Sequence, residues 1–310
     1  MEGRSGHSAE SPRVRLDRLQ VISWSRSWAK LPTIPGYRVL RDTRLRRENS
    51  PGYERVRYLV NVVSGTRVKW QYCRRTAYVR EWRITWGAGD GRAIQPSDLV
   101  PILGRCRFAR TILIELALDF YPPAGVDEGF VRRHARFGKS RRRMDRGGPD
   151  QLRYGTRKSA KLIRCYYKPE VQAYRVELEL HSRLINGRKP RWCMSSDAPE
   201  DMLDHISLMA LQIMPKHLQF VRFDWRALER YLVRTLGRAA VDAFLEEARR
   251  RACQSLAYAN RFLRKQNVRN VHRFLIPMRI NDAVETALSE WADRFQDSWP
   301  NNTAKEKGKR

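Results

Sequence analysis

Residues 154–168 read Tyr-Gly-Thr-Arg-Lys-Ser-Ala-Lys-Leu-Ile-Arg-Cys-Tyr-Tyr-Lys, and the expected fold follows from this stretch. Its first part predicts a turn, and residues 160–168 predict a strand. Residues 173–181 predict a further strand. Tyr166 lies among Arg and Lys residues, with no acid between Asp150 and Glu170. Nearby positive charge lowers the cost of a phenolate and stabilises charge on phosphorus, so Tyr166 is a candidate nucleophile for a phosphodiester.

The rest of the chain divides into a strand-rich part and a helix-rich part. Three short runs rich in Val, Tyr, Trp and Ile predict an antiparallel meander at 56–63, 67–73 and 77–86. Residues 111–121 predict a central strand that carries two acids. Apolar residues at helical spacing predict helices at 199–214, 225–236, 238–266 and 280–297. We therefore expect an α+β fold, with a mostly antiparallel catalytic sheet and a helical C-terminal lobe.

Four segments are expected along the chain. Residues 1–15 are polar and predicted to be disordered, residues 16–197 form the sheet domain, residues 198–297 form the helical lobe, and residues 298–310 form a disordered basic tail. The N-terminus has no apolar signal sequence, and no run is apolar enough to span a bilayer. The five cysteines are widely spaced and contain no Cys-x-x-Cys pair, which disfavours a zinc finger. These features indicate a cytoplasmic protein with reduced thiols and no membrane partner.

The charge of the chain indicates a polyanionic partner. Lys and Arg number 62 against 33 acids among 310 residues, which gives a formal net charge of +29. Such an excess is costly in self-repulsion, and nucleic acid is the first candidate partner, ahead of an anionic membrane. The excess is mostly arginine, whose planar fork suits phosphate and guanine edges. Charge alone predicts binding and no particular reaction.

Three short blocks occur in order between residues 110 and 180. They are Leu-Ile-Glu-Leu-Ala-Leu-Asp-Phe at 113–120, Gly-Thr-Arg-Lys-Ser at 155–159 with Arg-Cys-Tyr-Tyr-Lys at 164–168, and Arg-Val-Glu at 175–177. The ordered set resembles the Rep-trans family, the rolling-circle replication initiators of small plasmids and phages, with related relaxases of conjugative elements. The resemblance implies that residues 16–197 form a site-specific nicking domain.

The resemblance also implies roles for individual residues. Tyr166 would attack DNA, form a 5′-phosphotyrosine and release a 3′-hydroxyl for a polymerase, with Arg164 and Lys168 beside it. Mg²⁺ or Mn²⁺ would be held by Glu115, Asp119 and Glu177, with Glu179 as a further candidate, because hard cations prefer carboxylate oxygens. The period of two along a strand puts Glu115 and Asp119 on one face, Glu177 and Glu179 on one face, and Arg164, Tyr166 and Lys168 on one face.

Candidate nucleic-acid contacts surround this strand. Those after the turn are Arg157, Lys158, Ser159 and Lys161, and those in the basic run 131–146 are Arg141, Arg142 and Arg143. The basic run is equally well explained as a solvated loop. The six histidines form no His-x-His pair, which disfavours an endonuclease of the HUH type, and His181 alone is close enough to Glu177 and Glu179 to be considered as a ligand.

Departures from the family pattern leave three functions open. Leu113 stands where the family has an Arg, Tyr167 follows the nucleophile in place of an Asp or Asn, and Val171 stands where a Glu is usual. Tyr167 is therefore a rival nucleophile, and Glu115 and Asp119 have a structural ion pair with Arg as their alternative role. The expected functions are a rolling-circle initiator, a relaxase of a mobile element, and a catalytically inactive DNA-binding protein or repressor. The expected partners are a double-stranded origin, a single-stranded nick site, a host helicase and polymerase, and a second copy of the chain.

Overall fold

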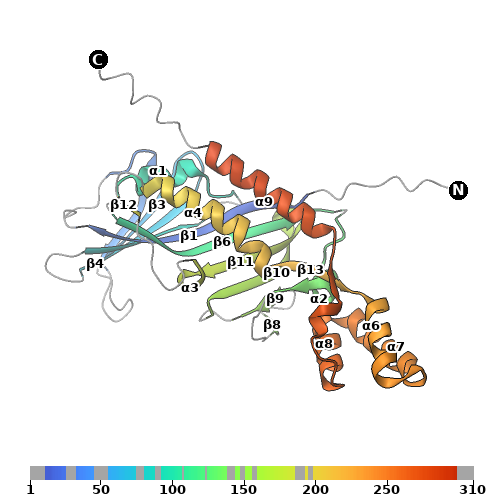
Figure 1. The fold of residues 1–310 in the computed structure, drawn as a ribbon. Coiled ribbons are helices and arrows are strands. Elements are labelled where there is room, and N and C mark those ends of the chain that lie inside the picture. Colours follow the sequence, from blue (N-terminus) through green and yellow to red (C-terminus); the bar gives the residue numbers. More distant parts are fainter. Residues whose placement is uncertain are drawn as a thin grey trace, which may run out of the picture.

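A computed structural model gives the fold. It describes residues 11–25, 33–44, 55–74, 80–87, 92–106, 108–122, 124–137, 144–146, 151–155, 159–185, 193–194 and 198–298. An antiparallel sheet of eleven strands runs through most of the molecule, with helices packed on it (Figure 1). The predicted α+β class with an antiparallel sheet is confirmed.

The sheet begins with a meander and ends with the strands that carry the motifs. In sheet order its strands are β2 (Tyr37–Arg44), β3 (Arg55–Asn61), β4 (Arg67–Arg74), β5 (Arg80–Gly87), β1 (Arg13–Ser25), β6 (Phe108–Phe120), β11 (Ala173–His181), β10 (Lys161–Lys168), β9 (Gln151–Tyr154) and β8 (Met144–Arg146), while β12 (Cys193–Met194) also pairs with β6. The predicted meander corresponds to β3, β4 and β5, and the predicted strand pair to β10 and β11. The expectation of disorder up to residue 15 is wrong for its last residues, because β1 starts at Arg13 and buries Val14.

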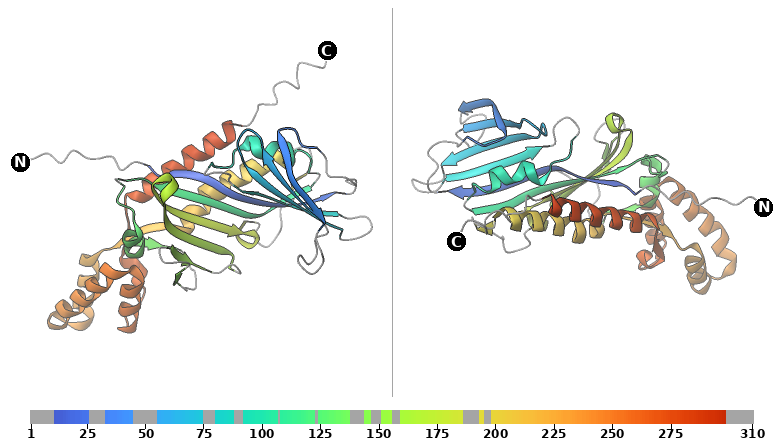
Figure 2. Two further views of the ribbon diagram at one scale, coloured as in Figure 1. Left: turned by 180° about the vertical axis from the view of Figure 1, so that it is seen from behind. Right: turned by 90° about the horizontal axis from the view of Figure 1, so that it is seen from above.

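Helices cover one face of this sheet. Those of the sheet part are α1 (Pro96–Leu103), α2 (Glu128–His134), α3 (Ser182–Ile185), α4 (Ala198–Gln212), α5 (Met214–His217) and α9 (Ile280–Asp297). The long helices α4 and α9 pack against each other and lie along the same face (Figures 1 and 2). Their apolar residues Ile206 and Leu288 share one core with Leu116 and Val176 of the sheet.

Two of the helices that we expected in the C-terminal lobe therefore belong to the sheet part. The boundary predicted near residue 197 reflects the change from strands to helices along the chain. Packing divides the molecule elsewhere, because α4 and α9 contribute to the sheet core, whereas residues 221–275 supply a second core.

The second core belongs to a lobe that projects from one end of the sheet (Figure 1). Its elements are α6 (Trp225–Leu236), α7 (Val241–Gln254), α8 (Leu256–Lys265) and two short 3-10 turns at 238–240 and 271–274. The single helix predicted over 238–266 is two helices, because Ser255 has an extended backbone and its side chain caps α8 by accepting from the backbone N–H of Ala257.

A small three-stranded sheet joins the lobe to the rest of the molecule. Its order is β14 (Leu275–Pro277), β13 (Gln219–Phe223) and β7 (Ala135–Arg136). Strand β13 contributes Phe220 to the sheet core and Phe223 to the lobe core. The chain enters and leaves the lobe at adjacent points, since the N–H of Asp224 donates to the carbonyl of Phe274 at 2.7 Å. Among the residues described, no helix is both long and apolar enough to cross a membrane.

Candidate functional site

The face of the sheet opposite α4 and α9 carries the predicted site residues. Apolar side chains of β6 and β11 point to the helices, so the alternate residues point to the other face. The pairing of β11 with β6 places Glu179 opposite Glu115 and Arg175 opposite Asp119. In the left view of Figure 2 this face is turned to the viewer, and the strands lie in front of α4 and α9. We call it the site face.

The next strand brings the predicted nucleophile to the same face. In the pairing of β10 with β11, Arg164 lies opposite Glu177 and Tyr166 lies opposite Arg175. Acidic and basic side chains thus alternate across three neighbouring strands. Tyr167 points the other way, and its side chain is 53% exposed.

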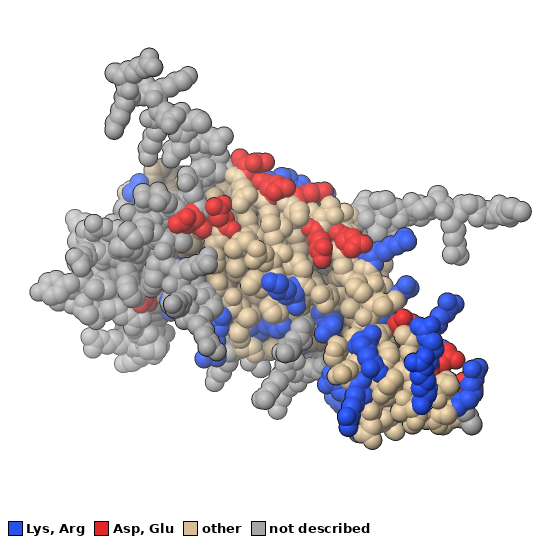
Figure 3. All heavy atoms as spheres, in the orientation of Figure 1, with Lys and Arg blue, Asp and Glu red and all other residues tan. Residues whose placement is uncertain are grey.

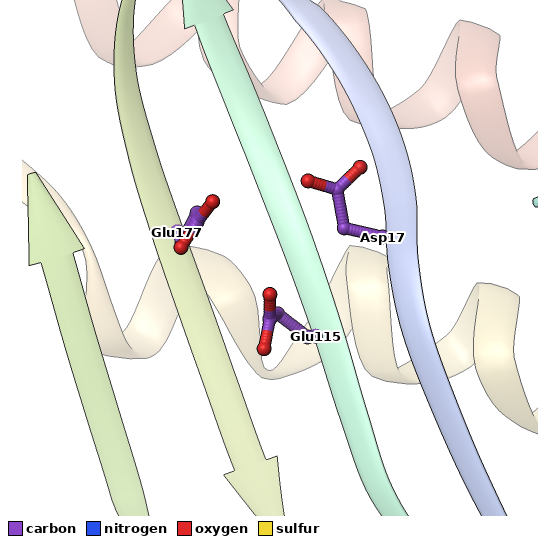
Figure 4. Close-up of side chains that lie close together, drawn as sticks. All are labelled: Asp17, Glu115 and Glu177. Carbon is purple, nitrogen blue, oxygen red and sulfur yellow. The ribbon is translucent and has the colours of Figure 1, made fainter. Parts of the chain in front are cut away.

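A fourth strand adds an acid that the sequence analysis missed. The pairing of β1 with β6 shifts between Leu16 and Arg18, so Asp17 is an extra residue in β1, a β-bulge. The bulge turns Asp17 toward the acids of β6 and β11 (Figure 4). A signal is present in the sequence, because the apolar spacing of two between Val14 and Leu16 becomes three between Leu16 and Leu19.

Arg175 neutralises two of these acids. Its Nε and Nη2 donate to the two carboxylate oxygens of Asp119 at 2.6 and 2.7 Å, and its Nη1 donates to Asp17 Oδ2 at 2.6 Å. Arg175 and Asp119 are both fully buried, and Arg15 adds a longer contact to Asp119 at 3.5 Å. Asp119, expected as a metal ligand, thus has both oxygens bound by a guanidinium, which is the structural alternative considered for it.

Arg164 connects two further acids. Its Nη2 lies 2.8 Å from Glu115 Oε1 and 2.8 Å from Glu177 Oε2. Arg18 lies farther away, 3.5 Å from Glu115 Oε2 and 3.8 Å from Glu179. Glu179 also contacts His181 Nε2 at 2.8 Å, so this predicted ligand pairs with the one histidine that we considered.

The hydroxyl of Tyr166 connects it to the acids of the site face through Glu177. The half-buried phenol donates a hydrogen bond to Glu177 Oε1 at 2.5 Å. Burial and the Glu177 carboxylate raise the pKa of Tyr166, and the opposing effects of Arg175 and Arg164 are smaller. The expectation that surrounding cations make the phenolate easy to form is therefore wrong for this arrangement, because burial and the acid that contacts the hydroxyl together outweigh the cations.

Three carboxylates lie close enough together that they could hold a metal ion. One oxygen each of Asp17, Glu115 and Glu177 lies within 4.8 Å of the others, and the side chains point toward one another from β1, β6 and β11 (Figure 4). Asp17 Oδ1 and Glu115 Oε2 are buried and have no hydrogen-bond partner. Burial raises the pKa of Glu115 to about 7, although Arg164 and Arg18 lower it. Buried carboxylate oxygens without a donor are costly, and a hard cation would satisfy them. Glu115 and Glu177 were predicted from the sequence.

The remaining predicted residues lie around this group or outside the described part. Lys168 is half-buried at the end of β10, and Ser159 is half-buried before it. Lys161, expected to contact DNA, is instead buried, and its Nζ donates to the carbonyl of Phe137 at 2.9 Å and lies 3.0 Å from His217 Nδ1. Arg157, Lys158, Arg141, Arg142 and Arg143 lie outside the described residues.

Comparisons with known protein families and curated proteins identified no relative of this chain. No family model matches the chain, and a search of the curated proteins finds no match. Fold and site therefore define what can be said of the class: an α+β protein whose antiparallel sheet holds a tyrosine hydroxyl against Glu177, one of three carboxylates that could bind a metal ion.

Proposed function

We propose that this protein nicks and rejoins DNA through a 5′-phosphotyrosine on Tyr166, and that it starts rolling-circle replication. One observation carries the proposal: the Tyr166 hydroxyl donates to Glu177, and Glu177 also belongs to the three carboxylates that suit a divalent ion. A nucleophile, a proton acceptor and a metal site are thereby in contact, as phosphoryl transfer requires. The resemblance to the Rep-trans family supports the same reaction.

The chain's own groups account for the movement of the proton. Glu177 Oε1 takes the proton of the Tyr166 hydroxyl as the phenol oxygen bonds to phosphorus. The bond from phosphorus to the 3′ oxygen breaks, the 5′ phosphate stays on Tyr166, and the 3′ oxygen takes a proton from water. Arg164, next to Glu177, stabilises the charge on the phosphate oxygens. The reverse sequence rejoins the strand.

The carboxylates define the cofactor of this proposal. Asp17, Glu115 and Glu177 would hold Mg²⁺ or Mn²⁺, which would polarise the scissile phosphate as a Lewis acid. The raised pKa of Tyr166 is consistent with Glu177 acting as the proton acceptor, because a protonated phenol is unreactive until its proton passes to Glu177. Asp119 and Arg175 would support the site by holding Asp17 in place.

The biological setting follows from the reaction. A released 3′-hydroxyl is a primer, so a host polymerase and a helicase are the proposed partners, with a duplex origin and a single-stranded nick site as substrates. We also propose a cytoplasmic location and a homodimer, by analogy with the Rep-trans family that the sequence resembles. Transfer of a mobile element would use identical chemistry, and the nicked sequence distinguishes it from replication.

A second candidate is supported by the ion pairs. Asp119 is saturated by Arg175, and Arg164 already contacts Glu115 and Glu177, as expected of a network that stabilises a fold. A DNA-binding protein or repressor without cleavage activity would need no more than this. The two candidates differ in whether a covalent adduct forms.

The deciding experiment uses supercoiled plasmid and a pool of single-stranded oligonucleotides, each with Mg²⁺ or Mn²⁺. We expect a nicked plasmid and a covalent adduct, which tryptic mass spectrometry assigns to Tyr166. The matched variants are Tyr166→Phe, which should abolish the adduct, and Tyr167→Phe, which should retain it because Tyr167 faces away from the carboxylates. An adduct on Tyr167, or salt-dependent binding without a nick under either metal, would reject the proposal.

A further inference from the structure

The projecting lobe has a charge distribution unlike that of the long helices. Residues 222–274 contain thirteen Lys or Arg and five Asp or Glu, and residues 248–281 contain no acid. Figure 3 shows basic side chains concentrated on the lobe, whereas acidic side chains gather over the region of α4 and α9. A basic surface of this kind is the electrostatic footprint of a nucleic-acid contact.

Helix α8 presents one part of this surface that is free to bind. It buries Leu256, Ala259 and Leu263 in the lobe core. Its outer side exposes Arg261, Arg264 and Lys265, and none of these three forms an ion pair with any residue in the described part of the chain.

By contrast, the basic residues of α7 are partly engaged. Arg250 and Arg251 contact Glu247, and Arg249 lies over the ring of Trp225 at 5.7 Å. The unpaired positive charge of the lobe therefore includes that of α8, on the side that faces solvent.

A hollow on α8 adds groups that can read bases. Asn260, Arg261, Arg264 and Lys265 line a space of about 350 Å³. The carboxamide oxygen of Asn260 is buried and has no hydrogen-bond partner. Asn pairs with the edge of adenine by two hydrogen bonds, and Arg pairs with guanine in the same way. Asn260 and Arg261 are thus residue types that such readout uses, and the Asn260 carboxamide would turn outward to reach a base.

The shape of the surface favours double-stranded DNA. The major groove is about 12 Å wide and admits an α-helix. Among the outward residues of α8, Tyr258 is the one aromatic side chain, which is too few for a platform that stacks successive bases of a single strand. An anionic membrane is disfavoured because the apolar residues of α8 are used in the lobe core.

We propose that α8 enters the major groove of duplex DNA, where Asn260 and Arg261 contact base edges and Arg264 and Lys265 contact phosphates. This inference goes beyond the nicking reaction, since it involves neither Tyr166 nor the carboxylates. A protein without any cleavage activity would still bind duplex DNA in this way. The lobe would thus choose the site on DNA at which the sheet acts.

The test uses the full chain with Tyr166→Phe, so that binding is measured without cleavage. Fluorescence anisotropy follows a labelled duplex of about 30 base pairs, roughly three helical turns, at several salt concentrations. Arg264→Ala with Lys265→Ala should weaken binding at least about tenfold and reduce the slope of log K against log salt by about 2, since two phosphate contacts are lost. The matched control, Arg230→Ala with Arg234→Ala, removes two exposed arginines from α6 and should weaken binding less than about threefold.

Base reading is tested by selection from duplexes with a randomised centre. We expect the intact lobe to select a preferred sequence, and Asn260→Ala to relax the preference at one position. Circular dichroism and urea denaturation exclude unfolding of each variant. Equal losses in the α8 and α6 variants, tighter binding to single strands or anionic vesicles than to duplex, or selection of no sequence would overturn the proposal.

Discussion

Replacing Arg175 by Met should be one of the most damaging single changes in this protein. Arg175 is fully buried, and its guanidinium binds both oxygens of Asp119 and one oxygen of Asp17. Met has a similar length and no charge, so the change leaves Asp119 and Asp17 each with only a long contact to Arg15, at 3.5 and 3.9 Å. Removing one partner of a buried ion pair costs about 3–5 kcal/mol.

Urea denaturation followed by circular dichroism measures this loss. With an m-value of about 3 kcal/mol/M, the midpoint should fall by roughly 1 M or more. The matched control is Arg250→Met, which breaks the exposed pair with Glu247 and should leave the midpoint unchanged. A double variant, Arg175→Met with Asp119→Leu, should recover at least half of the loss, because both buried charges of the bidentate pair are removed.

A midpoint for Arg175→Met within error of the control would refute the reasoning, as would a double variant less stable than Arg175→Met alone. Either result would mean that Asp119 does not depend on Arg175 for its charge compensation. Asp119 would then again be a candidate metal ligand.

Three further predictions concern the metal group, the pH dependence of stability and a turn. Asp17→Asn should weaken Mn²⁺ binding at least about tenfold by calorimetric titration, because a charged ligand is lost, whereas Asp42→Asn, at an acid of β2 that pairs with two arginines of β3, should not. Burial and Lys161 lower the pKa of His217 to about 4, so its contribution to stability is present above about pH 6.5 and is lost as the pH falls toward 4. The free energy of unfolding should therefore fall less between about pH 7 and pH 4.5 in His217→Gln than in the wild type, and equal slopes would contradict the shift. Gly155→Ala should destabilise the protein by about 1–3 kcal/mol, since Gly155 has a φ of +90° and an added Cβ would lie 2.6 Å from the carbonyl oxygen of Lys161; an unchanged midpoint would contradict this strain.

Much of the site could be predicted because the side-chain period of a strand is local. Glu115 and Asp119 on β6, and Arg164 and Tyr166 on β10, share a face whatever the partner strands are. The order of the blocks along the chain then suggested that the strands are neighbours. The pairing of β10, β11 and β6 puts them there.

What the sequence analysis missed depends on contacts between distant segments. The bulge at Asp17 exists because of how β1 pairs with β6, although the spacing of Leu16 and Leu19 hints at it. The pairing of Arg175 with Asp119 requires β11 to lie beside β6, so neither the Arg nor the acid reveals it alone. Lys161 was expected to contact DNA because its neighbours in the sequence are basic. Its burial depends on a contact with a distant residue, the hydrogen bond to the carbonyl of Phe137.

The helices show the same limit. Helical spacing located the long helices well, but it does not say which surface their apolar stripe will meet. α4 and α9 flank the lobe in sequence and nevertheless pack on the sheet. The break at Ser255 is a local cap, and the sequence offered that signal in a serine placed between two amphipathic stretches.

The hydrogen bond between Asp224 and Phe274 means that the lobe is an insertion whose two ends meet. Such an insertion can be replaced by another domain whose two ends are adjacent, because the flanking strands then keep their positions. Strands β13 and β14, which pair with each other, would hold a replacement lobe at the same end of the sheet. The properties of the lobe could then change without any change in the sheet.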